Sequence, residues 1–586
     1  MGVPGFVKWI SKKKKLSKAF ISTITKKVHT LYLDSNCLFH PQCFKVLEKI
    51  DETDHKKLEA LMIKRILAYI DFLIEEVEPT KRVFISVDGV PPVAKMNQQR
   101  KRRFMGVENK EFENNLKKEY GKKTSTWSNV VITPGTDFME RLHCALVKYI
   151  KSKKDGLEYI YSSYHHPGEG EHKILEHIRE RRHLKDVFVI YGLDADLISL
   201  AIASQKNNIY LLREVQHYGK FAKFVEDTPI QIKDEDDVSE ETNLMDIDVL
   251  KTKFGEYLFE SINEKDPDIK YSPKLTTRLI NDFIVLIVLL GNDFLPHFPS
   301  IHINQDGLDE LLNSYEIAFL DLKGSHDYKF LIDYNPKKNK IFINQPFLTY
   351  LLNEIADKEN IFITEKLPRF KSRRTRMKCY SRDEYDIKKW KHDMAIGCQV
   401  EDTIELGTGE QEEWKFKYYN KFFNCNEFYE ETVKTASYNY LKGFVWVTKY
   451  YFEGCPGYSW QYQHTHTPFI SDMADYLSSS KININNIKFA EKEILTPCQQ
   501  LLAVIPPQYS HLLPKNYQKL MFDDESPLML YYPRTYDIDM INRFILHEAV
   551  PMIPNVETDR IIKATKTIPL TKTEIIRNKT DVLIYN

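Results

Sequence analysis

Four short apolar runs, each of which ends in acidic residues, constrain the fold more than any other feature of this chain. They are HTLYLDSN (29–36), RVFISVDG (82–89), DVFVIYGLDAD (186–196) and NIYLLRE (208–214). Each run is rich in β-branched and aromatic residues and does not alternate with polar ones, which is typical of strands buried on both faces. Helical patterns at 55–78 and 136–153 separate them. Strands that alternate with helices predict an α/β fold with a parallel sheet flanked by helices.

The acidic residues at the ends of these runs predict a metal site. Ligands of a parallel sheet bind outside the carboxyl ends of its strands. Seven carboxylates come at such ends, or just after a Gly-rich turn or an apolar run: Asp34, Asp88, Glu169, Glu171, Asp194, Asp196 and Asp293. Two carboxylates about 4 Å apart repel by roughly 4 kcal/mol at an effective dielectric constant of 20, so a cluster of them needs protons or cations. Hard divalent ions such as Mg²⁺ prefer oxygen ligands, and a pair of them suits phosphodiester cleavage.

Each of these motifs also has a purely structural explanation. The segment PGEGEHK (167–173) can be a solvated turn whose glutamates favour the start of a helix. Asp194 and Asp196 can cap the helix that follows them, and Asp293 can be a turn residue. All three motifs fall at the same predicted edge of the sheet, which favours the metal site.

A basic helix face follows the second apolar run. In DGVPPVAKMNQQRKRRF (88–104) the prolines can begin a helix. Lys95, Gln99, Arg102 and Arg103 are then spaced i, i+4, i+7 and i+8, which places them on one face. Such a face suits a terminal phosphate because arginine donates in a forked geometry. The alternative is a solvated basic face, but a phosphate bound here would lie close to Asp88 and the metals.

The composition is compatible with binding to a polyanion such as a nucleic acid, and it argues against a membrane protein. The chain has 83 basic residues (Lys and Arg) and 83 acidic residues (Asp and Glu), so its formal net charge is zero. The basic residues nevertheless come in blocks such as KSRRTRMK (371–378), which can bind a polyanion. The eight cysteines form no CxxC pair, which fits a reducing compartment and gives no zinc knuckle. The longest apolar run, FIVLIVLLG (283–291), is far shorter than the roughly 20 residues that cross a bilayer. We expect a soluble intracellular protein.

Several further motifs, together with those above, resemble the eukaryotic 5′→3′ exoribonuclease (XRN) family. The matching stretches include MGVPGFVKWIS, YLDSNCLFH, VDGVPPVAKMNQQRKRRF, ITPGTDFMERLH, PGEGEHKI, GLDADLI and LLGNDFLPH. A second set includes YLKGFVWVTKYYFEGCPGYSWQY, QLLAVIPPQYSHLLP and YYPRTYDIDM. The resemblance runs from residue 1 to roughly residue 560 in matching order, and MNQQRKRRF next to VDGVPP is its most specific part.

The resemblance implies an enzyme that processively degrades single-stranded RNA with a 5′-monophosphate to mononucleotides, in RNA decay. Two Mg²⁺ ions, replaceable by Mn²⁺, would be held by the seven carboxylates named above, and Lys95, Gln99, Arg102 and Arg103 would form the 5′-phosphate pocket. Family members stack the first base between a histidine and a tryptophan, which correspond to His40 and Trp460. From the residues alone, His40 is a polar loop residue and Trp460 a core aromatic. We expect a monomer inside the cell, in the cytoplasm, with the nucleus as the alternative.

The resemblance also implies a PIN- or flap-nuclease-like sheet followed by a mostly helical second region. The expected division is a nuclease region at 1–225, an acidic linker or insertion at 226–270, a helical continuation at 271–365, a variable insertion at 366–413, an aromatic-rich second region at 414–560 and a weakly structured tail at 561–586. A compact form of the family and a Lys-, Ile- and Asn-rich composition favour an AT-rich genome, such as that of a large DNA virus or a protist.

Some positions depart from the family pattern, and two rival functions remain. Cys37 replaces a usual glycine, and Tyr458 stands where relatives often have tryptophan. A flap-endonuclease-like DNA nuclease shares an acidic α/β core, but it should carry a Gly-x-Gly helical hairpin that is missing after LLGNDFLPHFPS. A catalytically inactive RNA-binding relative would have lost acidic or basic site residues, and all are present.

Overall fold

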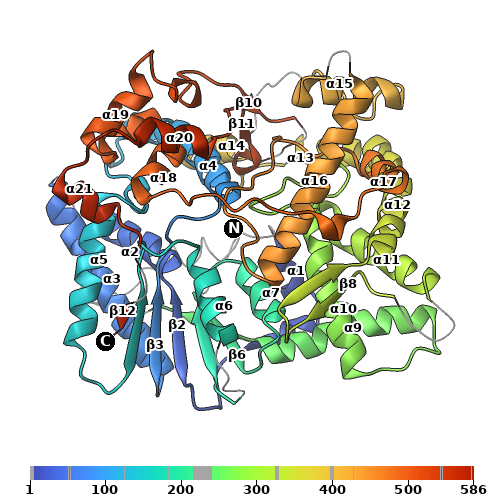
Figure 1. The fold of residues 1–586 in the computed structure, drawn as a ribbon, viewed down its shortest axis with the longest axis horizontal. Helices are drawn as coiled ribbons and strands as arrows, with labels where there is room; N and C mark the ends of the chain where they lie inside the picture. Colours follow the sequence, from blue (N-terminus) through green and yellow to red (C-terminus); the bar gives the residue numbers. More distant parts are fainter. Residues whose placement is uncertain are drawn as a thin grey trace.

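The computed structural model of the chain is built around one twisted sheet with helices on both sides and a large helical region beside it (Figure 1). It describes residues 5–50, 52, 54–124, 126–180, 185–214, 240–323, 329–375, 377–395, 402–425, 428–541, 543, 545–581 and 584–585. The predicted α/β class is confirmed, with a mostly parallel sheet that precedes the helical region.

The four apolar runs form the centre of the sheet. They become β2 (Thr30–Asp34), β3 (Arg82–Ser86), β5 (Phe188–Tyr191) and β6 (Ile209–Glu214). These strands and β4 (Glu158–Ser162) are parallel, in the order β6-β5-β2-β3-β4. Three antiparallel strands complete the edges: β7 (Thr242–Asp246) and β1 (Phe20–Ile21) beyond β6, and β12 (Ile584–Tyr585) beyond β4. The carboxyl ends of the parallel strands therefore lie together at one edge.

Alternate residues of each parallel strand enter two separate cores. Leu31, Val83 and Val189 pack under α2 (Ser35–Lys49), α3 (His55–Val77) and α5 (Asp137–Ser152). Tyr32, Phe84 and Ile190 pack on the opposite face, under α6 (Gly170–Glu180), α7 (Asp196–Ala203), α9 (Ile247–Lys265) and α10 (Pro273–Leu286). Because both faces are covered, the strands need apolar residues at every position, which explains the unbroken apolar runs.

The helical region continues the second of these cores. It contains α11 (Gly307–Asp321), α12 (Gln345–Ile361), α13 (Leu367–Thr375), α14 (Glu384–Asp393), α15 (Gln411–Phe423), α16 (Tyr429–Phe452) and α17 (Ile470–Ser479), with a hairpin of β8 (Ile332–Asn335) and β9 (Lys340–Ile343). Residues of α11, α12, α16 and α17 share one apolar cluster with the sheet face that α6 and α7 cover. The sheet and these four helices therefore share one core, whereas α15 packs in a separate apolar cluster.

A third group of helices packs against α4 (Val93–Glu119). It contains α18 (Pro497–Val504), α19 (Lys515–Phe522) and α20 (Thr558–Thr565), which lie around α4 in Figure 1. Val93 and Met96 of α4 share an apolar cluster with residues of these helices. Nearby, α21 is Lys572–Arg577, β10 is Ile538–Asp539 and β11 is Val550–Pro551, and α1 at the other end is Phe6–Lys12. This packing holds α4, which carries the predicted phosphate-binding residues.

Three segments differ from the expected organisation. The expected tail at 561–586 instead contains much of α20, all of α21 and strand β12, which pairs with β4. In the expected linker at 226–270, residues 226–239 lie outside the described residues, but β7 and α9 pack into the sheet and its core. The expected loop-rich insertion at 366–413 contains α13 and α14, while 376 and 396–401 lie outside the described residues. Polar composition hid the helices among these elements, because each buries only one face.

Among the described residues, no helix has the length and apolar content to cross a membrane.

The end of the chain, from α21 to β12, packs on the sheet region, and we expect the contact of α21 with α5 to stabilise the folded protein. Arg577 is 5 % exposed and its Nη1 lies 2.6 Å from Asp137 Oδ1 on α5. We expect Arg577→Ala to lower the free energy of unfolding by about 2 kcal/mol, through lost packing and a lost charge-assisted hydrogen bond. The matched control, Arg560→Ala, removes an exposed pair with Glu557 and should cost less than about 0.5 kcal/mol. Chemical denaturation measures both, and equal effects would contradict a docked end.

Candidate active site

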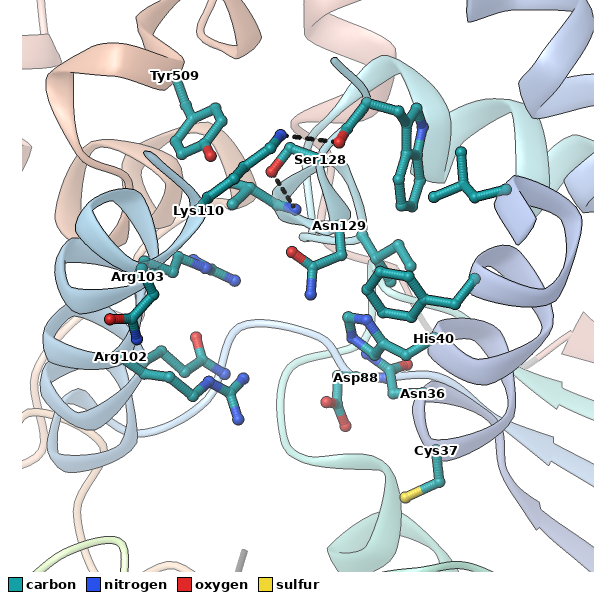
Figure 2. A pocket seen from close by; sticks show the side chains of 18 of the residues that line it. Asn36, Cys37, His40, Asp88, Arg102, Arg103, Lys110, Ser128, Asn129 and Tyr509 are labelled. Carbon is teal, nitrogen blue, oxygen red and sulfur yellow. Dashed lines mark hydrogen bonds between the residues drawn. The ribbon is translucent and has the colours of Figure 1, made fainter. Parts of the chain in front are cut away.

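A cavity of about 920 Å³ opens at the carboxyl edge of the sheet, between α2 and α4. Its lining contains six of the seven predicted carboxylates, the four predicted phosphate-binding residues and one predicted stacking residue: Asp34, Asp88, Glu169, Glu171, Asp194, Asp293, Lys95, Gln99, Arg102, Arg103 and His40. Figure 2 shows Arg102 and Arg103 on one side of it, opposite His40 and Asp88. Residues far apart in the sequence therefore meet at one place, as the strand ends predict.

The glycines of PGEGEHK allow the backbone of this segment to approach the carboxylates. The Gly170 N–H donates to Asp88 Oδ1 at 2.7 Å, and the Ser86 hydroxyl donates to the Gly170 carbonyl at 2.8 Å. A Cβ at Gly170 would lie only 2.9 Å from Asp34 Oδ1. A side chain at this position would therefore push the segment away from the strand ends. Glycine here keeps Glu169 and Glu171 beside the aspartates.

Asp196 is the one predicted carboxylate that does not line the cavity. It is the first residue of α7 and is 4 % exposed. Its Oδ1 accepts a hydrogen bond from the Tyr451 hydroxyl at 3.2 Å. The neighbouring Tyr450 hydroxyl donates to Glu169 Oε1 at 2.7 Å. Helix α16 of the helical region thus holds two of the carboxylates in place.

Burial and mutual repulsion raise the pKa of most of these carboxyl groups. Burial, with the charge of Asp88, raises the pKa of Asp34 to about 7 although Cys37 donates its thiol hydrogen to this carboxylate. Burial and the charges of Asp293 and Asp194 raise the pKa of Asp196 to about 7. Burial and Asp194 also raise the pKa of Glu171 well above its ordinary value. The site therefore takes up protons or cations readily.

Lys95 supplies one cation to this cluster. Its Nζ lies 2.6 Å from Glu169 Oε2 and 2.7 Å from Asp293 Oδ2. Burial alone would raise the pKa of Asp293, but the ammonium holds that pKa below its ordinary value. The structure thus places the Lys95 ammonium on carboxylates, at the boundary between the acidic cluster and the basic face of α4. The Lys95 ammonium balances only part of the negative charge of the seven carboxylates.

The remaining acidic groups fit a hard divalent cation. The donor set consists of carboxylate oxygens, which Mg²⁺ and Mn²⁺ prefer. Glu171 Oε2 is buried and has no hydrogen-bond partner in the protein. A buried carboxylate oxygen without a donor is costly, and a cation would satisfy it. The residues present therefore fit the metal ions that the sequence predicts.

The basic face of α4 lies across the cavity from His40. Arg102 is exposed to the cavity, and Arg103 is held by a hydrogen bond from its Nη2 to Thr133 Oγ1 at 2.9 Å. Burial, with the charges of Arg102 and Arg103, lowers the pKa of His40 to about 4. The imidazole is therefore neutral near pH 7 and can present its ring to a base without adding charge.

The structure does not bring Trp460 to the cavity that His40 lines. Its ring stacks on Trp446, with ring centroids 4.9 Å apart, and it does not belong to the cavity lining. The Trp446 indole N–H donates to the Gly457 carbonyl at 3.0 Å, which fixes the loop that precedes Trp460. Packing against α16 therefore sets the position of this tryptophan, as its interpretation as a core aromatic suggests.

Several residues around the site were not predicted from the sequence. Asn36 accepts a hydrogen bond from the Asp88 N–H at 3.1 Å, and Phe44 and Trp127 line the cavity beyond His40. Lys173 is 5 % exposed and donates to the Val87 and Ser163 carbonyls. The sequence shows this lysine in PGEGEHK, but its backbone partners lie just after β3 and β4 and could not be read from spacing.

The stabilising effect of Mg²⁺ should depend on pH. The pKa values of Asp34 and Asp196 are raised to about 7 in the folded protein, from an ordinary value of 3.8. The folded state therefore holds protons that the unfolded state has lost, and stability without metal falls as pH rises toward 7. Mg²⁺ bound by these carboxylates would compete with these protons, so its effect on Tm should grow from about pH 5 to about pH 7 and then level off. Thermal unfolding, with NaCl at matched ionic strength as control, measures this, and a pH-independent Mg²⁺ effect would contradict it.

Comparison with known proteins agrees with this fold. The family profile described as "XRN 5'-3' exonuclease N-terminus" matches residues 1–215, and the profile described as "Xrn1 helical domain" matches residues 274–378 and 371–585. The chain is 30% identical to human 5'-3' exoribonuclease 1 over 625 residues, and this match covers 99% of the chain. It is 28% identical to 5'-3' exoribonuclease 1 of Saccharomyces cerevisiae and 29% identical to 5'-3' exoribonuclease 2 of Arabidopsis thaliana, with 96% and 94% of the chain covered.

The chain spans less than two thirds of each of these relatives. The matches cover 35% of the human protein, 43% of the yeast protein and 63% of the Arabidopsis protein. The first profile matches the sheet region of the chain and the second matches its helical region, so the two together cover most of the chain. By its two matching profiles and its similarity across nearly its whole length, the chain belongs to the XRN family of 5'-3' exonucleases.

Proposed function

We propose that the chain is a processive 5′→3′ exoribonuclease that degrades 5′-monophosphorylated single-stranded RNA to mononucleotides. One observation carries the proposal: a single cavity holds an acidic cluster at the strand ends and, across from His40, a face of Gln99, Arg102 and Arg103. An acidic cluster that fits divalent ions supports phosphodiester hydrolysis, and a nearby basic face supports the recognition of a terminal phosphate. The names of the relatives, 5'-3' exoribonucleases 1 and 2, agree with this activity.

The seven carboxylates would hold two Mg²⁺ ions, which Mn²⁺ can replace. When bound, such a pair supplies a nucleophilic water and stabilises charge on the attacking and leaving oxygens. The residues of the chain keep the ligands in position: the Gly170 N–H orients Asp88, and the Tyr450 and Tyr451 hydroxyls orient Glu169 and Asp196. Lys95 links Glu169 to Asp293 and reduces the repulsion within the cluster. The ligand set is therefore preorganised before RNA enters.

The basic face would bind the 5′-monophosphate and set the register of cleavage. Arg102 and Arg103 offer forked donors to phosphate oxygens, and Gln99 adds an amide donor on the same face. Lys95 belongs to the predicted phosphate set and stands between this face and the acidic cluster. A phosphate held here would place the first phosphodiester bond of the RNA toward the carboxylates. A chain with a 5′-hydroxyl would lose this anchor.

Base stacking would retain the shortened RNA between cycles. We propose that the neutral ring of His40 stacks on the first base, a contact worth about 1–3 kcal/mol. We propose Trp460 as the second stacking residue, although its ring stacks on Trp446 in the structure and does not line the cavity. We further propose that the enzyme acts as a monomer in cytoplasmic RNA decay.

The first experiment compares single-stranded RNA with 5′-monophosphate, 5′-hydroxyl and 5′-triphosphate ends, with matched single-stranded DNA beside it. We expect release of mononucleotides from the monophosphorylated RNA only, with Mg²⁺ and not with chelator. Asp194→Ala should abolish hydrolysis and retain RNA binding, because it removes a metal ligand and no phosphate donor. Internal cuts or a preference for DNA would instead support a flap-nuclease-like enzyme. Tight RNA binding without hydrolysis would support an inactive binding protein.

A second experiment tests the phosphate face directly. Arg102→Ala should lower kcat/KM for 5′-monophosphorylated RNA by about 10- to 100-fold, because it removes a charge-assisted hydrogen bond, and should leave 5′-hydroxyl RNA unaffected. Lys101→Ala is the matched control, because Lys101 lies next to Arg102 on α4 but does not line the cavity. Steady-state kinetics on both substrates measure the preference. An unchanged preference in Arg102→Ala would remove this helix face from the pocket.

A further inference from the structure

A second cluster of metal-ligand residues lies outside the cavity, where the end of the chain packs on the sheet region. It consists of Glu140, His143 and His165, each of which offers one ligand atom within 4.8 Å of the other two. Among the described residues, this is the one group of His, Cys, Asp and Glu side chains with that geometry. Glu140 and His143 lie one turn apart on α5, and His165 follows β4. In Figure 1, α21 and β12 lie beside α5 and β4.

A backbone carbonyl fixes the tautomer of His165. Its Nδ1 lies 2.8 Å from the Lys579 carbonyl oxygen, which can only accept a hydrogen bond, so Nδ1 carries the hydrogen. In the neutral ring, Nε2 then presents a lone pair, and this atom lies 3.4 Å from Glu140 Oε2. A lone pair that faces a carboxylate is stable only with a cation or a proton between the two atoms. Zinc-binding histidines commonly have such a ring N–H bonded to a carbonyl.

We propose that Glu140, His143 and His165 bind a divalent transition-metal ion of the Zn²⁺ class. Zn²⁺ takes imidazole nitrogen and carboxylate oxygen at about 2.0–2.2 Å in tetrahedral geometry, which separates two ligand atoms by roughly 3.3–3.5 Å. The distance of 3.4 Å between His165 Nε2 and Glu140 Oε2 matches this separation. The fourth position would be open to water. The site differs from the acidic cluster in chemistry, because imidazole nitrogen selects Zn²⁺ over Mg²⁺.

The bound ion would fasten the end of the chain to the sheet region. The Asp581 N–H donates to the His165 carbonyl at 3.1 Å, and the Tyr164 hydroxyl contacts both Glu140 and the Arg577 carbonyl. His165 lies only four residues before Glu169, and the Gly89 N–H bonds to the Gly168 carbonyl in the same loop. An ion at this site therefore stabilises the docked segment and the loop that carries two carboxylates of the acidic cluster. Its role is structural.

Zinc binding tests the proposal. Full-length protein stripped with chelator is titrated with Zn²⁺ against a chromophoric zinc indicator, in excess Mg²⁺ so that the acidic cluster is occupied. We expect one tight site per chain, and His143→Ala should weaken it by about 100-fold or more, because it removes a ligand. His143→Ala keeps the His165 and Glu140 pair, so it separates a metal site from a simple ion pair. Co²⁺ should show the visible absorption of a tetrahedral complex in the wild type only.

Two control variants address other Zn²⁺ ligands. Cys144→Ser removes a thiol that lies 3.7 Å from Glu140 Oε1, and His511→Ala removes an exposed histidine elsewhere. Both should bind Zn²⁺ as the wild type does. If His143→Ala does not fold, Glu140→Gln serves instead, because its amide oxygen still accepts from Tyr164 while the ligand charge is lost.

A second measurement reports on the docked segment. Zn²⁺ should raise the Tm of the wild type and slow its digestion by carboxypeptidase, and His143→Ala should show neither effect. The proposal is overturned if the wild type binds no Zn²⁺ in excess Mg²⁺, which would leave a protonated histidine paired with Glu140. It is also overturned if His143→Ala binds Zn²⁺ as tightly as the wild type.

Discussion

The ion pairs of Lys95 with Glu169 and Asp293 are the interaction on which the site depends. They join helix α4, the segment before α6 and the segment after α10, so they connect the basic face to the acidic cluster. The side chains of all three residues are less than 15 % exposed, and removing one partner would leave a buried charge uncompensated. The fold supports this arrangement because the parallel strands end together and α18 to α20 hold α4 in place. The packing that holds α4 therefore also fixes the Lys95 ammonium against the carboxylates of the site.

Much of the sheet and most of the site could be predicted from the sequence. Strands β2, β3, β5 and β6 are buried on both faces, so their apolar runs are unbroken and easily recognised. Asp34 and Asp88 follow such runs directly, and parallel pairing alone brings their carboxylates to one edge. The spacing of Gln99, Arg102 and Arg103 likewise places them on one helix face. In each case the prediction rests on a pattern within one strand or one helix, and the tertiary structure preserves that element.

Other parts depend on tertiary contacts that no local pattern records. Strand β12 has two residues and exists because it pairs with β4, so the end of the chain looks unstructured in sequence. The ammonium of Lys95 lies on two carboxylates because burial favours a paired charge. Trp460 lies against Trp446 because hydrogen bonding of the Gly457 carbonyl sets the preceding loop. The cluster of Glu140, His143 and His165 joins one helix to a loop beyond the next strand, and its tautomer depends on a carbonyl from the end of the chain.

The central claim is that the buried carboxylates at the strand ends form a centre for two metal ions. Anomalous diffraction from crystals grown with Mn²⁺ tests it most directly, because Mn²⁺ scatters anomalously and accepts the same oxygen ligands as Mg²⁺. The account predicts two peaks about 3.5–4 Å apart within the carboxylate cluster, in contact with residues such as Asp34, Asp88 and Asp194. A cluster without Mn²⁺ peaks would contradict it, and so would ions bound only outside the cavity.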